Sequence, residues 1–276
     1  MRYLERNKTM NNPIGVFDSG VGGLTVAREL MRQLPNEDLV YFGDTARVPY
    51  GSKSKKTVLK YSRQIVRFLR TKDVKAIVVA CNTASALALD EIAAEIDIPI
   101  IGVVKPGAKM AVETTKTGNV GVIGTESTIK SGIYNEYIRE LNPEITVVSK
   151  ACPLFVPLVE EGLIEDRVTD DIVSRYLQEM KEYRVDALVL GCTHYPLIRN
   201  TIKRFVGDSV HLVNPAFETA KSLKELLTEQ GILNMDKHKP EYEYYVSDGV
   251  DKFISFADSV LPCHVTDTCV VDIESY

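Results

Sequence analysis

Short runs of aliphatic and β-branched residues alternate with helical patterns along almost all of the 276 residues. Val58, Tyr61, Ile65 and Leu69, for example, are spaced three or four positions apart, as on one face of a helix. The short runs are apolar throughout, as expected of strands covered on both faces in a parallel sheet. The alternation therefore predicts an α/β fold of largely parallel sheets flanked by helices. The predicted strands are Ile14–Phe17, Leu39–Phe42, Ala76–Ala80, Ile98–Val103, Val120–Ile123, Ile145–Val148, Ala187–Leu190 and Val210–Val213.

An internal repeat divides this pattern into two related parts. The first predicted strand and its continuation to Ser19 recur in the run that ends at Thr125, and the run that ends at Cys81 recurs in the run that ends at Cys192. Any two buried strands share Val, Ile and Ala, so the apolar positions alone would not establish a duplication. The cysteine stands at the same strand end in both copies, however, which favours two similar halves with the same order of elements.

Composition excludes several classes of protein. The net charge is −5, with basic and acidic residues interspersed, which argues against a nucleic-acid-binding surface. No apolar stretch approaches the roughly 18 residues of a membrane span, and residues 1–12 lack the apolar core of a secretory signal. The five cysteines include no CxxC pair, as expected for reduced thiols in the cytoplasm. A soluble, cytoplasmic protein with a loose N-terminal tail is predicted.

Two cysteines stand where reactive thiols are expected. Cys81 and Cys192 each end an apolar strand, and each is followed by polar residues that open a helical segment. Ligands of open α/β sheets bind at the carboxyl ends of strands, and a helix N-terminus lowers a thiol pKa from about 8.5 toward neutrality. A single cysteine here could equally be a small buried apolar residue, but two in matched settings favour a chemical role. Cys152, Cys263 and Cys269 lack this setting and are interpreted as structural. A metal site built from Cys263, His264 and Cys269 would have irregular spacing and is disfavoured.

Two loops follow the first two predicted strands. The loop from Asp18 to Thr25 holds three glycines that would let backbone amides approach an anion. It resembles a dinucleotide loop, but Thr25 stands where the third glycine of that motif would fall, and no Walker A sequence occurs, so a small carboxylate suits it better. In the second loop, Tyr50 and Gly51 could contact a ligand and Arg47 could bind a carboxylate, although a plain surface connection is slightly favoured.

The two thiols, together with Asp18 and His194, suit a reaction in which a proton is removed from one face of a carbon atom and a proton is delivered to the opposite face. Inversion needs two groups, because a single base would return the proton to the face it came from. Two thiols can serve, since thiol and thiolate are both accessible near neutral pH. Asp18 and His194 could tune the thiols or relay protons, or simply cap loops. No metal-binding motif or cofactor motif accompanies them.

Five segments, taken together and in order, resemble bacterial glutamate racemases of the aspartate/glutamate racemase superfamily. They are Asp18-Ser-Gly-Val-Gly-Gly-Leu, Gly43-Asp-Thr-Ala-Arg-Val-Pro-Tyr-Gly, Ala80-Cys-Asn-Thr-Ala, Cys152-Pro-Leu-Phe-Val-Pro-Leu-Val-Glu-Glu-Gly and Leu190-Gly-Cys-Thr-His-Tyr-Pro. The match runs from about Pro13 to at least Pro196.

This resemblance implies interconversion of L- and D-glutamate for peptidoglycan synthesis, without pyridoxal phosphate or metal. Cys81 would act on the D-enantiomer and Cys192 on the L-enantiomer, with Asp18 and His194 assisting. Glu160 lies near a position sometimes linked to catalysis, with Glu161 beside it. The implied substrate-binding residues are Asp18, Ser19, Tyr50, Gly51, Asn82, Thr83, Thr125, Thr193 and His194.

The resemblance also implies two similar α/β domains that face each other across the active site. Residues 13–104 and 215–276 would form the first, residues 105–214 the second, and residues 1–12 a flexible tail. The chain would return to the first domain near Asn214, where an aspartate is usual, and a homodimer is common in such enzymes. Two alternatives remain at this point: racemisation of aspartate or another substituted acid, and a ligand-binding or regulatory protein on the same scaffold, such as one that binds DNA gyrase.

Overall fold

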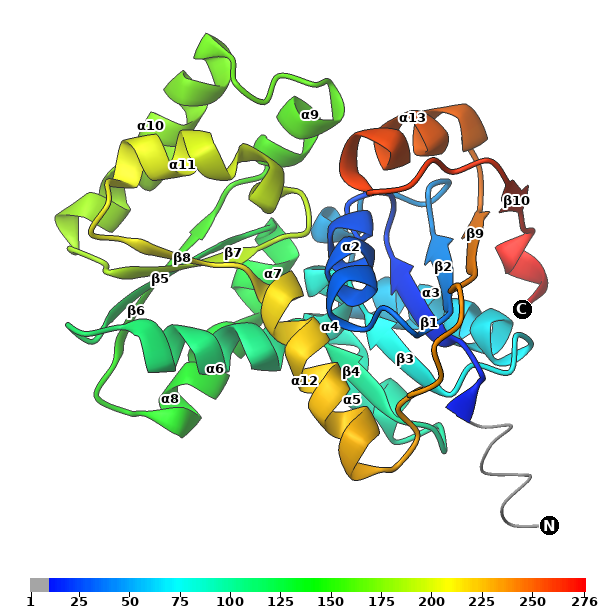
Figure 1. Ribbon diagram of the computed structural model, residues 1–276. Helices are drawn as coiled ribbons and strands as arrows, with labels where there is room; N and C mark the ends of the chain where they lie inside the picture. Colours follow the sequence, from blue (N-terminus) through cyan, green and yellow to red (C-terminus); the bar gives the residue numbers. More distant parts are fainter. Residues whose placement is uncertain (1–9) are drawn as a thin grey trace.

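The structure is a computed structural model that describes residues 10–276, so most of the predicted tail at residues 1–12 lies outside the described residues. Within residues 10–276 the chain forms two parallel β-sheets with helices on both faces of each (Figure 1). The predicted α/β class is confirmed.

The first sheet of the described residues has six strands in the order β10-β9-β2-β1-β3-β4, and the second has four in the order β6-β5-β7-β8. All neighbouring strands are parallel. The strands of the first sheet are β1 (Ile14–Asp18), β2 (Leu39–Gly43), β3 (Ala76–Val79), β4 (Ile100–Gly102), β9 (Tyr242–Val246) and β10 (Thr268–Val270). Those of the second are β5 (Asn119–Gly124), β6 (Thr146–Ala151), β7 (Ala187–Gly191) and β8 (His211–Val213).

The sequence repeat corresponds to a repeated sheet. The order β2-β1-β3-β4 in the first sheet matches β6-β5-β7-β8 in the second, so β1 is equivalent to β5 and β3 to β7. Cys81 and Cys192 therefore follow equivalent strands. The segment that contains β9 and β10 extends the first sheet alone. Each sheet and the helices on it are called a lobe below; the predicted limits at residues 104/105 and 214/215 stay predictions.

All eight predicted strands are present, with small differences at their ends. The strand predicted at Ile98–Val103 covers only Ile100–Gly102, and the one predicted at Ile145–Val148 is shifted to Thr146–Ala151. β9 and β10 were not predicted. Within β9 only Tyr244 and Val246 are buried, and β10 is a largely exposed edge strand. Neither strand therefore shows the continuous apolar run of a strand covered on both faces.

Helices on the first sheet follow the spacing of their apolar residues. In α3 (Lys55–Arg70) the Ser54 hydroxyl caps the first turn by accepting from the Thr57 N–H at 3.3 Å, and Val58, Ile65 and Leu69 are buried on one face. Complete burial of such a side chain contributes about 1.5–3 kcal/mol. With α3, the same face is covered by α4 (Asn82–Leu87) and α5 (Leu89–Ala93).

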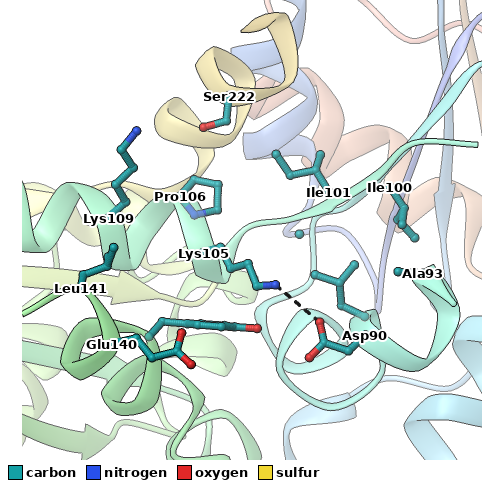
Figure 2. Close-up of a pocket in the computed structure, with 13 residues that line it drawn as sticks. Asp90, Ala93, Ile100, Ile101, Lys105, Pro106, Lys109, Glu140, Leu141 and Ser222 are labelled. Atoms are coloured by element: carbon teal, nitrogen blue, oxygen red, sulfur yellow. Dashed lines mark ion pairs between the residues drawn. The ribbon is translucent and has the colours of Figure 1, made fainter. Parts of the chain in front are cut away.

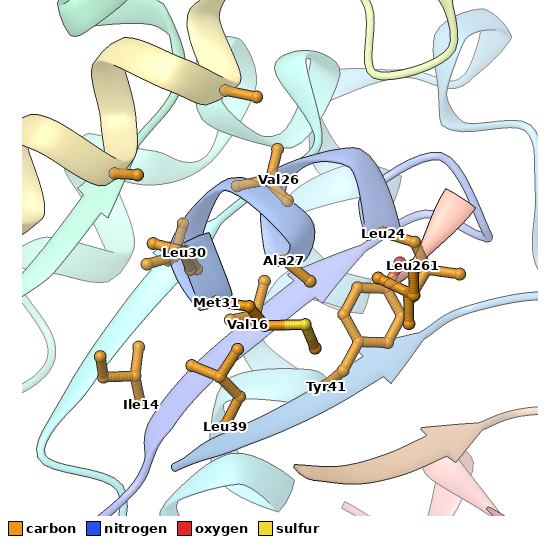
Figure 3. Packing of buried hydrophobic residues seen from close by; sticks show 14 of the residues in the cluster. Ile14, Val16, Leu24, Val26, Ala27, Leu30, Met31, Leu39, Tyr41 and Leu261 are labelled. Atoms are coloured by element: carbon orange, nitrogen blue, oxygen red, sulfur yellow. The ribbon is translucent and has the colours of Figure 1, made fainter. Parts of the chain in front are cut away.

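The opposite face of the first sheet is covered by α2 (Leu24–Gln33), α12 (Pro215–Glu229) and α13 (Val250–Val260). Leu24, Ala27 and Leu30 of α2 pack directly onto the strand residues in this core (Figure 3).

The second sheet has α6 (Val104–Thr114) and α8 (Ile133–Leu141) on one face. Its other face carries α9 (Phe155–Glu160), α10 (Arg167–Glu182) and α11 (Arg199–Val206), and α7 (Glu126–Ser131) follows β5. Helix α12 contacts both α2 and α6, so it joins the two lobes (Figure 1). Its N-cap is Asn214, whose Oδ1 accepts from the Ala216 N–H at 3.2 Å, a role that asparagine and aspartate fill equally well.

Candidate active site

Cys81 lies just beyond β3 and caps α4. Its Sγ accepts a hydrogen bond from the Ala84 N–H at 3.4 Å, and the residue is only 5% exposed. Burial and the nearby charge of Asp18 raise the pKa of this thiol to about 12. The expectation that a helix N-terminus would lower this pKa is wrong for Cys81, because the loss of hydration outweighs the hydrogen bonds from Ala84 and Ser19. Cys81 is therefore a protonated thiol at neutral pH.

Asp18 ends β1 and is completely buried beside Cys81. Its Oδ2 accepts from the Gly20 N–H at 3.0 Å, whereas its Oδ1 has no hydrogen-bond partner among the described residues. Burial raises the pKa of Asp18, and the charge of His194 opposes that rise. The effects of Asp18 on Cys81, and of His194 on Asp18, show that residues of both lobes meet here.

Cys192 follows β7 and is joined to a short chain of polar groups. His194 Nδ1 lies 3.9 Å from Cys192 Sγ, and His194 Nε2 lies 3.2 Å from Glu160 Oε1. Burial alone would lower the His194 pKa, but these two hydrogen bonds raise it to about 10. The hydrogen bond to His194 in turn lowers the pKa of Glu160 to about 2. A protonated imidazole so placed stabilises a neighbouring thiolate.

The two thiols are close enough to interact, since the charge of Cys192 contributes to the raised pKa of Cys81. Their surroundings differ, however. Thr83 occupies the position in the first copy of the repeat that His194 occupies in the second. One thiol thus lies beside a buried carboxyl group and the other beside an imidazolium, so the site can hold one acid and one base at the same time.

The loop after β2 is not the plain surface connection that was slightly favoured. Tyr50 is buried and its hydroxyl donates to the buried Asp44 carboxylate. Arg47 is not directed to a ligand: its Nε lies 2.8 Å from Asp44 Oδ2 and its NH1 lies 3.0 Å from Glu274 Oε1. Arg47 therefore connects this loop to the last residues of the chain.

Hydroxyl groups connect the lobes at the two residues that follow Cys81. Thr83 Oγ1 of the first lobe lies 2.9 Å from Thr125 Oγ1 and 3.2 Å from Thr128 Oγ1 of the second. The Tyr134 hydroxyl, on α8, donates to Asn82 Oδ1 at 2.7 Å. The amide nitrogen of Asn82 consequently stays available for another partner. Thr128 and Tyr134 were not singled out in the sequence, because each lies in an ordinary helical pattern.

Two glycines permit the lobes to approach closely. A Cβ added at Gly22 would come within 2.4 Å of Thr193 Oγ1 and 2.5 Å of His194 Nδ1, and one at Gly51 within 2.6 Å of Thr125 Cβ. The Thr25 hydroxyl also donates to the Thr193 carbonyl at 3.0 Å. In the loop after β1, Gly22 thus leaves room for side chains of the other lobe, and the predicted approach of this loop's backbone amides to an anion stays a prediction.

The predicted site residues lie together where the two lobes meet. The loops after β1, β3, β5 and β7 supply most of them, at the carboxyl ends of parallel strands. The structure adds residues that the sequence analysis did not single out, and it places Glu160, rather than Glu161, against His194. The added residues are Asp44, Thr128, Tyr134 and Lys252.

A cavity of about 570 Å³ lies elsewhere between the lobes, and none of the predicted site residues lines it (Figure 2). Its walls come from α5, β4, α6, α8 and α12. Lys105 and Asp90 form an ion pair across it at 3.7 Å.

None of the helices in residues 10–276 has both the length and the apolar character that a membrane span needs. In the same residues, no group of three or more His, Cys, Asp or Glu side chains is arranged to hold a metal ion. The five cysteines, all within this range, are free thiols.

Comparison with known proteins places this geometry in context. Residues 14–223 match the family model described as Asp/Glu/Hydantoin racemase. A glutamate racemase of Geobacter metallireducens is 48% identical over 262 residues, which cover 95% of this chain and 97% of the relative.

Solved structures give the same relationship. A glutamate racemase isoform, RacE1, of Bacillus anthracis has a TM-score of 0.92 and 41% identity, with 95% of this chain and 97% of that chain covered. The glutamate racemase of Francisella tularensis, solved in complex with D-glutamate, has a TM-score of 0.90 and 42% identity, with 97% and 100% covered.

Proposed function

This chain belongs to the Asp/Glu/hydantoin racemase family, and on that premise we propose that it interconverts L- and D-glutamate with Cys81 and Cys192 as opposed acid and base. The observation that carries the proposal is the pair of cysteines after equivalent strands of two repeated sheets, one beside Asp18 and the other beside His194. The chain supplies both groups itself, so we propose a reaction that needs no cofactor.

In the direction from L to D, the Cys192 thiolate removes the α-proton and the Cys81 thiol delivers a proton to the opposite face. Cys192 ends as a thiol and Cys81 as a thiolate, and D-glutamate reacts in the reverse sense. His194 stabilises the Cys192 thiolate through the contact at 3.9 Å, and Glu160 stabilises the charged imidazole.

The remaining predicted residues are proposed to bind glutamate. Asp18 Oδ1 can accept from the substrate ammonium group, since it has no other partner among the described residues. The Asn82 amide nitrogen, left available by Tyr134, can donate to a carboxylate. The other proposed substrate contacts are Ser19, Tyr50, Gly51, Thr83, Thr125, Thr193 and His194.

Glutamate is preferred to aspartate because the similar proteins at 41–48% identity carry the name glutamate racemase. We further propose that the D-glutamate serves peptidoglycan synthesis and that the enzyme works in the cytoplasm as a homodimer. The peptidoglycan role and the homodimer rest on the resemblance of the sequence motifs, and the cytoplasmic location rests on the five cysteines without a CxxC pair.

The decisive experiment is proton NMR of L-glutamate with the purified protein in deuterated buffer, with chiral detection of the product. Loss of the α-proton signal together with the appearance of D-glutamate supports the proposal. If the α-proton of L-aspartate exchanges faster in the same assay, aspartate replaces glutamate as the proposed substrate. Glutamate binding without exchange would point instead to a ligand-binding protein.

A further inference from the structure

An ion pair connects the two lobes beside Cys192. Lys252 Nζ, on α13, lies 3.1 Å from Glu160 Oε2, at the end of α9. Helix α13 packs into the core of the first lobe through Phe253 and Ala257, whereas α9 packs into that of the second through Phe155. The two helices face each other at the same end of the molecule (Figure 1).

Glu160 uses one oxygen for each lobe. Its Oε1 lies 3.2 Å from His194 Nε2 within its own lobe, and its Oε2 pairs with Lys252 of the other. We propose that Lys252 is a positioning residue, which holds Glu160 against His194 and so keeps His194 charged beside Cys192. This inference deepens the proposed racemase function and rests on it.

Glu160 needs such a partner because of where it lies. It is the last residue of α9 and its side chain is 19% exposed, so a carboxylate without a second contact can turn toward water. The ion pair also borders a cavity of about 140 Å³ that reaches Gly20 in the loop after β1. The other charged group lining that cavity is Asp248.

The location of Lys252 gives only one of the two cysteines this chain of contacts. Helix α13 lies between β9 and β10, which have no counterpart in the second sheet, so the duplicated part of the fold lacks it. On the Cys81 side, the position equivalent to His194 is Thr83, which cannot carry a charge. The chain of contacts from Lys252 through Glu160 and His194 therefore ends at Cys192, and Cys81 has no equivalent chain among the described residues.

Positioning and simple electrostatics predict opposite changes when Lys252 is lost. Removing a positive charge near His194 would raise the His194 pKa, whereas release of Glu160 would lower it. The charged or titratable groups that face His194 are Cys192, Asp18 and Glu160, and those that face Glu160 are His194 and Lys252. The sign of the change thus separates the two explanations.

The experiment is a pH titration of the full-length protein by nitrogen-15 NMR of its four histidines. The variants are Lys252→Met, Lys252→Arg and the control Lys55→Met, which removes an exposed lysine paired with Glu91 at 2.9 Å. In the unchanged protein His194 should titrate well above its ordinary value of about 6.5. Lys252→Met should lower the pKa of His194 by about one pH unit, and the other two variants should leave it within about 0.3.

An unchanged or raised His194 pKa in Lys252→Met would overturn the positioning role, as would a pKa near 6.5 in the unchanged protein. In the racemase assay, kcat should fall about tenfold in Lys252→Met and recover in Lys252→Arg. The titration does not depend on turnover. A lowered pKa without any racemase activity would therefore refute the proposed function and leave the Lys252–Glu160–His194 linkage established.

Discussion

At the scale of single residues, the two cysteines are chemically unequal although their strands are equivalent. Cys81 is desolvated beside Asp18, and burial keeps it a thiol. Cys192 has a protonated imidazole as its neighbour. The proposed reaction needs such unequal neighbours, because one cysteine must give a proton while the other takes one. The difference comes from the residue two positions after each cysteine, Thr83 in one copy and His194 in the other.

Replacement of either thiol should stop racemisation in both directions. Cys81→Ala and Cys192→Ala each remove a group that must take or give the α-proton, so kcat should fall by about 10²–10⁴ or more. Chiral detection of glutamate measures the loss, and circular dichroism checks the fold. Cys269→Ala, at an exposed position, is the control and should keep full activity. Activity within tenfold of normal in either active-site variant would exclude the two-thiol mechanism.

The Glu160–His194 pair should make stability depend on pH in acid. The folded-state pKa of Glu160, about 2, lies below its ordinary value of 4.5, so its contribution is complete above pH 4.5 and is lost as the pH falls toward 2. Because the carboxylate is partly exposed, screening limits this contribution to about 1–2 kcal/mol. Urea unfolding at pH 7 and pH 3 should show that the normal protein loses about half of this amount more than Glu160→Gln does, because the loss is still incomplete one pH unit above the folded-state pKa. Parallel losses in the two proteins would contradict the pKa assignment.

At the scale of elements, the carboxyl and amino ends of the strands in the first sheet have different roles. The carboxyl ends of its strands carry the candidate site. The opposite end is held by Lys75, which is completely buried and pairs with Glu37 at 2.5 Å. Lys75 also donates to the carbonyl oxygens of Met10 and Ile232, at 2.5 and 3.0 Å. One side chain thus connects the segments before β1 and after α12 to the sheet.

Loss of Lys75 should therefore affect stability and not catalysis. Lys75→Met leaves the Glu37 carboxylate buried without its cation, which should cost about 3–5 kcal/mol in the free energy of unfolding, measured in urea. Adding Glu37→Gln removes the unpaired buried carboxylate and should recover part of the lost free energy of unfolding. Lys109→Met, at an exposed pair, is the control and should change stability by less than about 0.5 kcal/mol. A large change in KM with normal stability would show that this end of the sheet is coupled to the site.

At the scale of the whole molecule, the site exists only where the two lobes close on each other. Contacts between lobes surround it: Thr83 with Thr125, Tyr134 with Asn82, and Lys252 with Glu160. Cys81 and Cys192 are only 5% and 6% exposed, so we expect these contacts to open when glutamate enters.

A small side chain in the loop after β1 should hold the lobes apart. Gly22→Ala places a Cβ within 2.4–2.5 Å of Thr193 and His194, so closure becomes costly and kcat/KM should fall by about 10² or more while each lobe stays folded. Gly20→Ala is a matched control two residues away, because its Cβ meets nothing closer than 3.4 Å and the N–H to Asp18 is kept. Small-angle X-ray scattering with and without D-glutamate reports closure. Equal activity in the two variants would rule out the close approach.

The amino-acid sequence by itself determined the class of fold, eight of the strands, the duplication and the location of the site residues at strand ends. Apolar periodicity and the position of a cysteine in each repeat are local signals, and both can be recognised without knowledge of the fold. The sequence did not reveal β9 and β10, because a half-buried strand and an exposed edge strand lack a continuous apolar run.

Only the tertiary structure decided the charge states of the site and the contacts that hold it. The pKa of Cys81 rises because distant segments bury it next to Asp18. The pKa of His194 rises through hydrogen bonds with Cys192 and with Glu160, which is 34 residues earlier in the chain and lies 3.2 Å from the ring. Lys252 reaches Glu160 from the other lobe, 92 residues away in sequence. Burial and charge depend on which residues surround a group in space, and no local pattern of the sequence records that.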